Sequence, residues 1–203
     1  MEKIKIWNEV PSADQAQAAA DIISRGELAI IPTDSVYAIV CDALDSKAIA
    51  ALCRLKGINP DKNNLSILCS DISMAAEYAH IDNNGFRMMR EHTPGAVTFL
   101  FRASHSLPRA FKSRKTVGIR IPDNQTALSI VKALGHPVLS TSIEFPDSDH
   151  AREPELIEEL YANRGVALIV DDGDGGDEFS TILDCTDSSR PTVVREGKVQ
   201  FDD

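Results

Sequence analysis

Hydroxyl and cationic side chains recur in this sequence at the points where short apolar runs begin or end. Thr33 follows the run Leu28–Ile31, Arg120 closes a later run, Ser180 opens another, and Arg195 ends the last long one. In open α/β sheets, ligands bind at strand ends near the points where the connectivity reverses. A phosphate group needs several short donors and fixed cations around one anion. Each residue alone is compatible with a turn hydroxyl or a surface cation, but their recurrence predicts a basic, polar hollow for a phosphate-bearing ligand.

Further residues of the same types stand at comparable positions: Lys56, Lys62, Thr98, Thr141 and Ser142. The sequence contains neither a G-x-x-x-x-G-K-[ST] phosphate loop nor a G-x-G-x-x-G dinucleotide motif, and it also lacks H-E-x-x-H and G-x-S-x-G. Its five histidines are scattered, so a catalytic histidine pair has little support. An enzyme of this kind would work by positioning and electrostatic stabilisation, as is common in phosphate and nucleotide chemistry.

The four cysteines, Cys41, Cys53, Cys69 and Cys185, each lie in or beside an apolar run, and none forms a C-x-x-C pair. This placement predicts buried thiols in a reducing compartment rather than metal ligands or disulfides. The acidic segment 171–177 is rich in aspartate and glycine, but it lacks the spacing of an EF-hand, which needs a glutamate at its twelfth position. We expect a solvated loop there, and no metal site.

The formal net charge of −10 argues against a generic surface for nucleic acid or anionic membranes. The segment 86–120 departs from this average, because it holds eight Lys or Arg residues and one acid. Such a segment is either a solvated basic face or a local anion site, and its Lys112, Arg114 and Lys115 are the candidates for RNA contacts. No apolar run approaches the ~18 residues of a membrane span, and no signal-peptide pattern occurs. We therefore expect a cytoplasmic protein without a membrane partner.

Alternating short apolar runs and amphipathic stretches predict an α/β protein. The predicted strands are 4–7, 28–31, 36–41, 65–69, 96–102, 116–121, 138–142, 166–170, 180–184 and 192–195. The predicted helices are 13–24 (N-cap Ser12), 47–56 (N-cap Ser46), 72–79 (N-cap Asp71), 84–92, 125–134 and 155–163, the last opened by Pro154. Gly26, Gly57 and Gly135 are placed to end three of these helices.

The length of 203 residues fits one domain, and no linker, repeat or low-complexity stretch divides the chain. The strands are more numerous than a pure βαβ alternation would give. Short connections between 28–31 and 36–41, and between the last two strands, imply some antiparallel pairing. We expect a single domain over 1–203, built on one large, twisted sheet of mixed parallel and antiparallel strands with helices packed on it.

The segment 26–37, GELAIIPTDSVY, resembles the G-x-(apolar)-x-P-T-[DE]-T-V-Y signature of the YrdC/YciO family. Six shorter matches follow in the family's order: KG at 56–57, TPGAVT at 93–98, GIRIP at 118–122, LSTS at 139–142, FSTILD at 179–184 and VREG at 194–197. One such string is weakly specific, whereas six in order over nearly the whole chain are strongly specific. The sequences of segments 65–71 and 139–142 resemble the YciO branch of the family more than the authentic synthases.

The resemblance implies the family's fold, a twisted mixed sheet with a concave, positively charged cavity. It also implies double-stranded RNA binding and the family's best-known activity, synthesis of L-threonylcarbamoyladenylate from L-threonine, bicarbonate and ATP on the route to a tRNA modification. ATP, together with Mg²⁺, is then a substrate or ligand, and no tightly bound cofactor is expected. Thr33 and Tyr37 would line the amino-acid and adenylate pocket, and Arg120 would lie on the cavity wall. The residues facing the nucleotide or its phosphates would be Lys56, Thr98, Thr141, Ser142, Ser180, Thr181 and Arg195.

Two positions depart from the synthase pattern of the family. Synthases carry K-x-R where this chain has K-G-I at 56–58, and S-x-N where it has S-I-E at 142–144. The first change removes a bidentate phosphate donor, and the second places the carboxylate of Glu144 in the site, where it adds repulsion. We therefore expect a nucleotide- and RNA-binding protein with weak or absent synthase activity. The alternatives are a competent synthase, in which Lys62 stands in for the missing arginine, and a plain interaction domain without a ligand.

Overall fold

The computed structural model describes residues 1–7 and 10–201. The strands within them are β1 (Glu2–Lys5), β2 (Leu28–Ile31), β3 (Ala38–Asp42), β4 (Ser66–Leu68), β5 (Ala79–His80), β6 (Val97–Ala103), β7 (Thr116–Arg120), β8 (Val138–Ser142), β9 (Val166–Asp171), β10 (Thr181–Asp184) and β11 (Thr192–Arg195). The helices are α1 (Ala13–Ser24), α2 (Ser46–Lys56), α3 (Ile72–Tyr78), α4 (Asn83–His92), α5 (Gln125–Leu134), α6 (Ser148–Arg152) and α7 (Pro154–Tyr161), with a short 3₁₀ helix η1 (Arg109–Phe111). The predicted α/β class is confirmed.

The strands join into one mixed sheet in the order β1-β9-β2-β3-β8-β4-β7-β6-β10-β11, with β5 paired to β6 beside this path. The pairs β1·β9, β9·β2, β4·β7 and β6·β10 are parallel. The pairs β2·β3, β3·β8, β8·β4, β6·β7, β5·β6 and β10·β11 are antiparallel. Both short connections predicted to be antiparallel hairpins are therefore confirmed, and so is the mixed character of the sheet.

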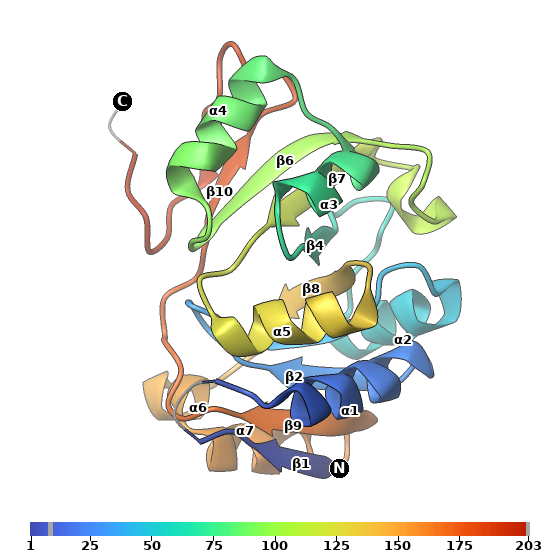
Figure 1. Cartoon of the computed structure of the whole chain (residues 1–203), viewed down its shortest axis with the longest axis vertical. Helices are drawn as coiled ribbons and strands as arrows, with labels where there is room; N and C mark the ends of the chain where they lie inside the picture. The colour runs from blue at the N-terminus through green and yellow to red at the C-terminus, as the bar shows by residue number, and fades with distance from the viewer. Residues whose placement is uncertain (8–9, 202–203) are drawn as a thin grey trace.

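Alternate residues of the central strands face two separate hydrophobic cores. In β2, Ala29 and Ile31 belong to the core under α1 and α5, whereas Leu28 and Ile30 belong to the core that includes residues of α2 and α7. This alternation is the period of two that a strand buried on both faces must have. Figure 1 shows α1 and α5 side by side over the half of the sheet that contains β2 and β9, and α3 and α4 over the half that contains β6 and β7.

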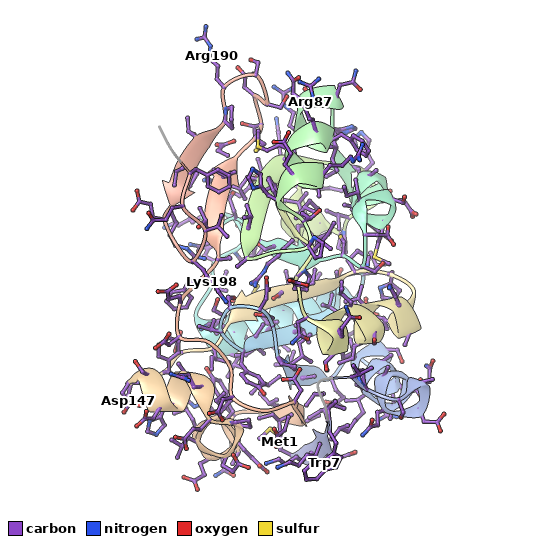
Figure 2. All side chains as sticks on the ribbon, turned by 60° about the vertical axis from the view of Figure 1, so that its left-hand side comes forward. Met1, Trp7, Arg87, Asp147, Arg190 and Lys198 are labelled. Carbon is purple, nitrogen blue, oxygen red and sulfur yellow. The ribbon has the colours of Figure 1, made fainter. Side chains whose placement is uncertain are left out.

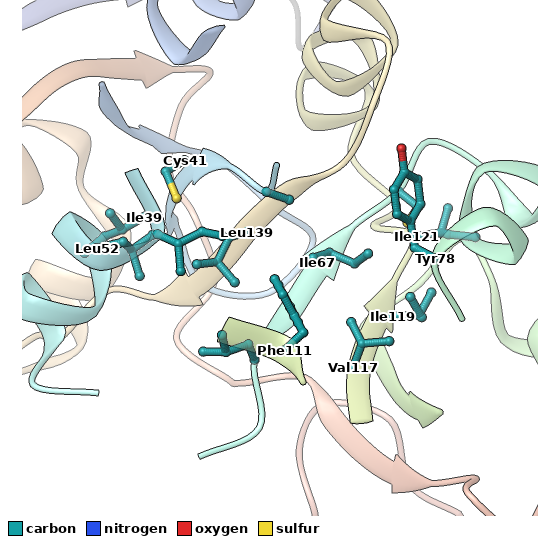
Figure 3. Close-up of a cluster of buried hydrophobic side chains, with 14 of the residues drawn as sticks. Ile39, Cys41, Leu52, Ile67, Tyr78, Phe111, Val117, Ile119, Ile121 and Leu139 are labelled. Atoms are coloured by element: carbon teal, nitrogen blue, oxygen red, sulfur yellow. The ribbon is translucent and has the colours of Figure 1, made fainter. Parts of the chain in front are cut away.

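The larger core runs without interruption from one half of the sheet to the other. Figure 3 shows Leu52 of α2 against Ile39 and Leu139, and then Ile67, Phe111 and Val117 farther along the sheet. Each of these side chains is at most 2 % exposed, and burial of a side chain of this size stabilises the fold by roughly 1.5–3 kcal/mol. The strands that carry the polar residues of interest are thus packed on one face against a continuous hydrophobic core.

Local signals account for most of the helix boundaries. Ser12 caps α1 in a capping box with Gln15, and Asp71 caps α3 by accepting from the Met74 amide, both as predicted. The prediction of Ser46 as the N-cap of α2 is wrong, because the Asp45 carboxylate accepts from the Lys47 amide at 2.7 Å and makes Ser46 the first helical residue. The first strand covers Glu2–Lys5 rather than 4–7, and α6, β5 and η1 were not predicted.

Polar residues at strand ends converge because neighbouring strands bring them to the same part of the sheet. Ser66 of β4 is in register with Gly118 of β7 and with Ser140 of β8. Thr98 of β6 pairs with Ile182 of β10, which in turn pairs with Arg195 of β11. Neighbouring strands thus carry hydroxyl and cationic residues toward the same part of the sheet.

Candidate functional site

A polar hollow of ≈ 170 Å³ lies where the sheet passes from β8 through β4 and β7 to β6 and β10. Its lining residues are Leu52, Ile58, Asn64, Leu65, Ser66, Leu68, Thr98, Arg120, Leu139, Ser140, Thr141, Ser142, Ser180, Ile182 and Arg195. Gly118 lies between two of them, and a Cβ atom on it would be 2.9 Å from the Cβ of Ser66 and 3.1 Å from the Cγ2 of Thr98. A glycine is required here because any side chain would force these strands apart.

Arg120 is the most buried cation at the hollow, with 7 % of its surface exposed. Its Nη2 donates to Asp34 Oδ1 at 2.6 Å, to Ser35 Oγ at 2.8 Å and to Thr33 Oγ1 at 3.3 Å. The turn after β2 is therefore tied to the end of β7 by one guanidinium. The Nε of Arg120 is buried and has no hydrogen-bond partner among the residues that the structure describes.

Arg195 approaches the same hollow from the last strand. Its Nε and Nη2 donate to the Ser180 carbonyl oxygen at 3.2 and 2.7 Å, and its guanidinium lies 5.3 Å from the centroid of the Phe179 ring. The Ser180 hydroxyl is 3.0 Å from that of Thr98. Burial, and then the positive charge of Arg120, lower the pKa of Arg195. Two cations and several hydroxyls therefore line the hollow together.

Lys56 ends α2, and its side chain is 9 % exposed. Its Nζ lies 3.0 Å from Glu144 Oε1, whose side chain is 63 % exposed. The backbone of Glu144 is fixed because its amide donates to the hydroxyl of the buried Tyr161 at 2.8 Å. Glu144, which departs from the synthase pattern, thus neutralises Lys56, which matches that pattern.

A further cation near the site, Lys198, was not predicted. Its Nζ donates to the carbonyl oxygen of Asp34 at 2.7 Å, and its amide donates to the carbonyl oxygen of Phe179 at 2.9 Å. Figure 2 shows Lys198 at the narrow middle of the molecule, where the chain leaves the last strand. No sequence pattern marked it, because it is one lysine in a segment without periodicity.

The structure brings together six of the predicted site residues in the lining of the hollow: Thr98, Arg120, Thr141, Ser142, Ser180 and Arg195. Thr33 is linked to them through Arg120. Lys56 lies near the rim beside the lining residues Leu52 and Ile58 of its own chain segment. Asn64, Ser66 and Ser140 also line the hollow but were not predicted, although Ser66 and Ser140 occupy polar positions in apolar strands, which is a usable signal.

Besides Thr33 and Lys56, three more predicted residues lie outside the lining. Tyr37 is fully buried, and its hydroxyl donates to the Gly173 carbonyl oxygen at 2.7 Å, so that it anchors the acidic segment. The hydroxyl of Thr181 donates to the Val199 carbonyl oxygen and fixes the segment after β11. Lys62 is exposed in the connection before β4. Lys62 does not line the hollow, so no contact supports its proposed role as a substitute for the missing arginine.

The basic candidates Lys112, Arg114 and Lys115 are exposed on the connection between η1 and β7. Arg114 Nε donates to the side-chain oxygen of Asn64 at 3.3 Å, and Asn64 lines the hollow. The basic connection therefore borders the rim of the candidate site. Of the basic segment 86–120, Arg120 lines the hollow and Arg114 borders it, whereas Arg87 lies at the end of the molecule (Figure 2).

The acidic segment 171–177 is held at several points rather than being free in solvent. Asp171 is buried at the end of β9 near Lys3 and Lys5, and the Gly176 amide donates to the Ser35 carbonyl oxygen at 2.8 Å.

The four cysteines are free and buried, as predicted, and burial raises the pKa of Cys185 to about 12. In residues 1–7 and 10–201 no group of three or more His, Cys, Asp or Glu residues is arranged to hold a metal ion.

Residues 21–197 match the model of the Sua5/YciO/YrdC family, described as telomere recombination. The chain therefore belongs to this family, which confirms the resemblance found in the sequence. Over 182 residues it is 38 % identical to YciO of Escherichia coli K12, which corresponds to 88 % of this chain and 87 % of that protein. The crystal structure of E. coli YciO matches with a TM-score of 0.87 at 35 % identity and covers 98 % of this chain and 96 % of that one.

Two comparisons reach the synthases of the family. A threonylcarbamoyl-AMP synthase of Bacillus subtilis is 27 % identical over 201 residues, which is 97 % of this chain and 57 % of that protein. The crystal structure of P. abyssi Sua5 complexed with L-threonine has the same fold, with a TM-score of 0.82 at 24 % identity over 97 % of this chain and 57 % of that chain. In the part of this chain that the structure describes, no helix is long and apolar enough to cross a membrane.

Proposed function

We propose that this chain binds an adenine nucleotide through its phosphate in the hollow between Arg120 and Arg195. The observation that carries the proposal is the buried Nε of Arg120, which lacks a partner within the described residues although the side chain lines the hollow. A buried donor without a partner costs about 1–3 kcal/mol. A phosphate oxygen would satisfy this donor. It would also favour the charged form of Arg195, whose pKa is lowered by burial and then by the positive charge of Arg120.

The adenine nucleotide and the amino acid are inferred from relatives rather than from geometry. The B. subtilis relative is a threonylcarbamoyl-AMP synthase, and P. abyssi Sua5 has been crystallised with L-threonine. We include ATP with Mg²⁺, AMP and L-threonine among the ligands to be tested. Hydroxyls of Thr98, Thr141, Ser142 and Ser180 would supply the short hydrogen bonds that a phosphate group accepts.

Isothermal titration calorimetry with AMP and ATP tests this proposal. Arg195→Ala should weaken binding by about 1.5–3 kcal/mol, which is the usual loss for a hydrogen bond to a charged group. The matched control is Arg190→Ala, since Figure 2 places Arg190 at the end of the molecule, away from Lys198. An unchanged affinity in a folded Arg195→Ala protein would remove this residue from the site, and no binding by the wild-type protein would refute the proposal.

We also propose that synthase activity is weak or absent. Ile58 lies at the hollow where synthases carry an arginine, and the carboxylate of Glu144 forms an ion pair with Lys56. The test compares pyrophosphate release by the wild-type protein, Ile58→Arg, Glu144→Asn and the double variant, with ATP, L-threonine and bicarbonate. The double variant should gain about tenfold, which corresponds to 1.4 kcal/mol of transition-state stabilisation. High activity of the wild-type protein would instead support a competent synthase.

RNA binding is a second candidate function, and the link between Arg114 and Asn64 favours it. This contact brings Arg114 to the rim of the hollow, and Lys112 and Lys115 are exposed on the same connection. A nucleic-acid backbone contacting them would have the polar hollow next to it. The corresponding measurement follows from the salt dependence of phosphate contacts.

A further inference from the structure

The cations of the candidate site differ in whether a carboxylate of the protein neutralises them. Arg120 is paired with Asp34 at 2.6 Å, and Lys56 is paired with Glu144 at 3.0 Å. In the described residues no carboxylate forms an ion pair with Arg195, whose guanidinium contacts the carbonyl and hydroxyl oxygens of Ser180. An incoming anion therefore meets uncompensated positive charge at Arg195 but an already neutralised cation at Lys56.

The backbone segment that carries Glu144 is held by two contacts. The backbone of Glu144 is held by the hydroxyl of Tyr161, and the next residue, Phe145, stacks on Phe179 with ring centroids 5.7 Å apart. Phe179 in turn supports the guanidinium of Arg195 at 5.3 Å. A stack of two aromatic rings thus connects the segment that carries Glu144 to the guanidinium of Arg195.

We infer that Glu144 determines ligand specificity by holding Lys56 as its counterion, so that the hollow favours a ligand with a single phosphate over one with further anionic groups. The inference rests on the proposed nucleotide binding at the hollow. A phosphate monoester carries about two negative charges near neutral pH, and Arg195 with Lys198 can balance them. A di- or triphosphate brings additional charges. Besides Arg120, which is paired with Asp34, the cation that remains among the predicted nucleotide-facing residues is Lys56.

Two costs oppose such a ligand. Its extra phosphates must compete with a carboxylate at 3.0 Å for Lys56, and Glu144 repels them when they approach. Discrimination by an unfavourable charge against the wrong ligand is a general route to specificity. Because Lys56 is 9 % exposed, solvent screens its interaction with a competing anion less than it would at an open surface.

The test is a double-mutant cycle in which the affinities for AMP and ATP are measured by calorimetry in Mg²⁺-free buffer of fixed ionic strength. The proteins are the wild type, Glu144→Gln, Lys56→Met and the double variant. Glu144→Gln should raise the affinity for ATP relative to AMP about tenfold, because Lys56 becomes available to the additional phosphates. Lys56→Met should abolish this gain in the double variant. The matched control is Glu159→Gln, which removes the same charge from an exposed position of α7.

The outcomes separate this inference from the proposal on which it rests. An ATP gain in Glu144→Gln that disappears when Lys56 is replaced supports the inference. AMP binding with an unchanged ratio in Glu144→Gln overturns it while leaving nucleotide binding intact. A gain that persists without Lys56, or that Glu159→Gln reproduces, also overturns it, because the effect is then one of overall charge. If neither the wild type nor any variant binds AMP or ATP, the proposed function and this inference both fall.

Discussion

Replacement of Arg120 by methionine is expected to cost more stability than any other single change at the site. The substitution leaves the Asp34 carboxylate, whose side chain is 11 % exposed, without its ion pair at 2.6 Å. It also removes the donor to the hydroxyls of Ser35 and Thr33. Loss of one partner from a buried ion pair costs about 3–5 kcal/mol, because the other charge remains buried and uncompensated.

The expected loss lies at the lower end of this range, near 3 kcal/mol, since Lys198 donates to the backbone of Asp34 and leaves one cation nearby. For a domain of this length, 1 kcal/mol shifts the melting temperature by about 2–4 °C, so a decrease of roughly 6–12 °C should be seen. Urea unfolding followed by circular dichroism, without ligand, gives the free energy. Arg102→Met, an exposed position in β6, is the control and should change stability by less than about 0.5 kcal/mol.

The double variant Asp34→Asn/Arg120→Met distinguishes the ion pair from packing. Because the buried carboxylate is gone, the double variant should be less destabilised than the sum of the two single variants, by about 1 kcal/mol or more. Additive losses, or a loss below about 1 kcal/mol for Arg120→Met, would show that the cluster contributes little through its charges.

Three further outcomes are expected. Gly118→Ala should destabilise the protein by about 1–3 kcal/mol through overpacking against Ser66 and Thr98, and Ser66→Gly should restore part of the loss in urea unfolding. The amide of Met74 lowers the pKa of Asp71 from 3.8, so the stability lost in Asp71→Ala, about 0.5–2 kcal/mol, should be complete at pH 6 and diminish as the pH falls below 3.8. RNA binding should fall with salt at a slope of about −0.7 to −0.9 per neutralised phosphate in filter-binding assays. Charge reversal at Lys112, Arg114 and Lys115 should weaken it, whereas reversal at Arg152, Arg164 and Arg190 should not.

The strands and helices were largely predictable because their signals are local. The run Leu28–Ile31 and the segments 125–134, 138–142 and 192–195 have the predicted bounds, since each ends at a glycine, a proline or a polar cluster. The cap of α2 was misplaced by one residue because Asp45 and Ser46 are both good N-caps and stand side by side. Helix α6 was missed because five residues are too few to show a helical period.

The candidate site was predictable in composition but not in its pairings. The sequence marks Lys56 and Glu144 as interesting positions, yet the ion pair between them depends on how α2 and β8 meet in the fold. The same holds for Arg120 and Asp34, which belong to β7 and to the turn after β2. Tyr37, in turn, matches the family signature but is buried against Gly173. Periodicity places residues on faces and at strand ends, but only tertiary structure decides which opposite charges meet.

The distribution of buried and exposed charge explains how one family fold can carry different chemistry. Arg120 is hydrogen-bonded to the turn after β2, and Gly118 faces side chains of β4 and β6, so a change at either would disturb the packing of the sheet. Glu144 and Ile58 lie after the last residues of β8 and α2, where a carboxylate can point to solvent and an aliphatic side chain can pack partly against the core. Substitution there costs little folding free energy but alters which charges a ligand meets. The positions where this chain departs from the synthase pattern are therefore those at which specificity can change while the scaffold is retained.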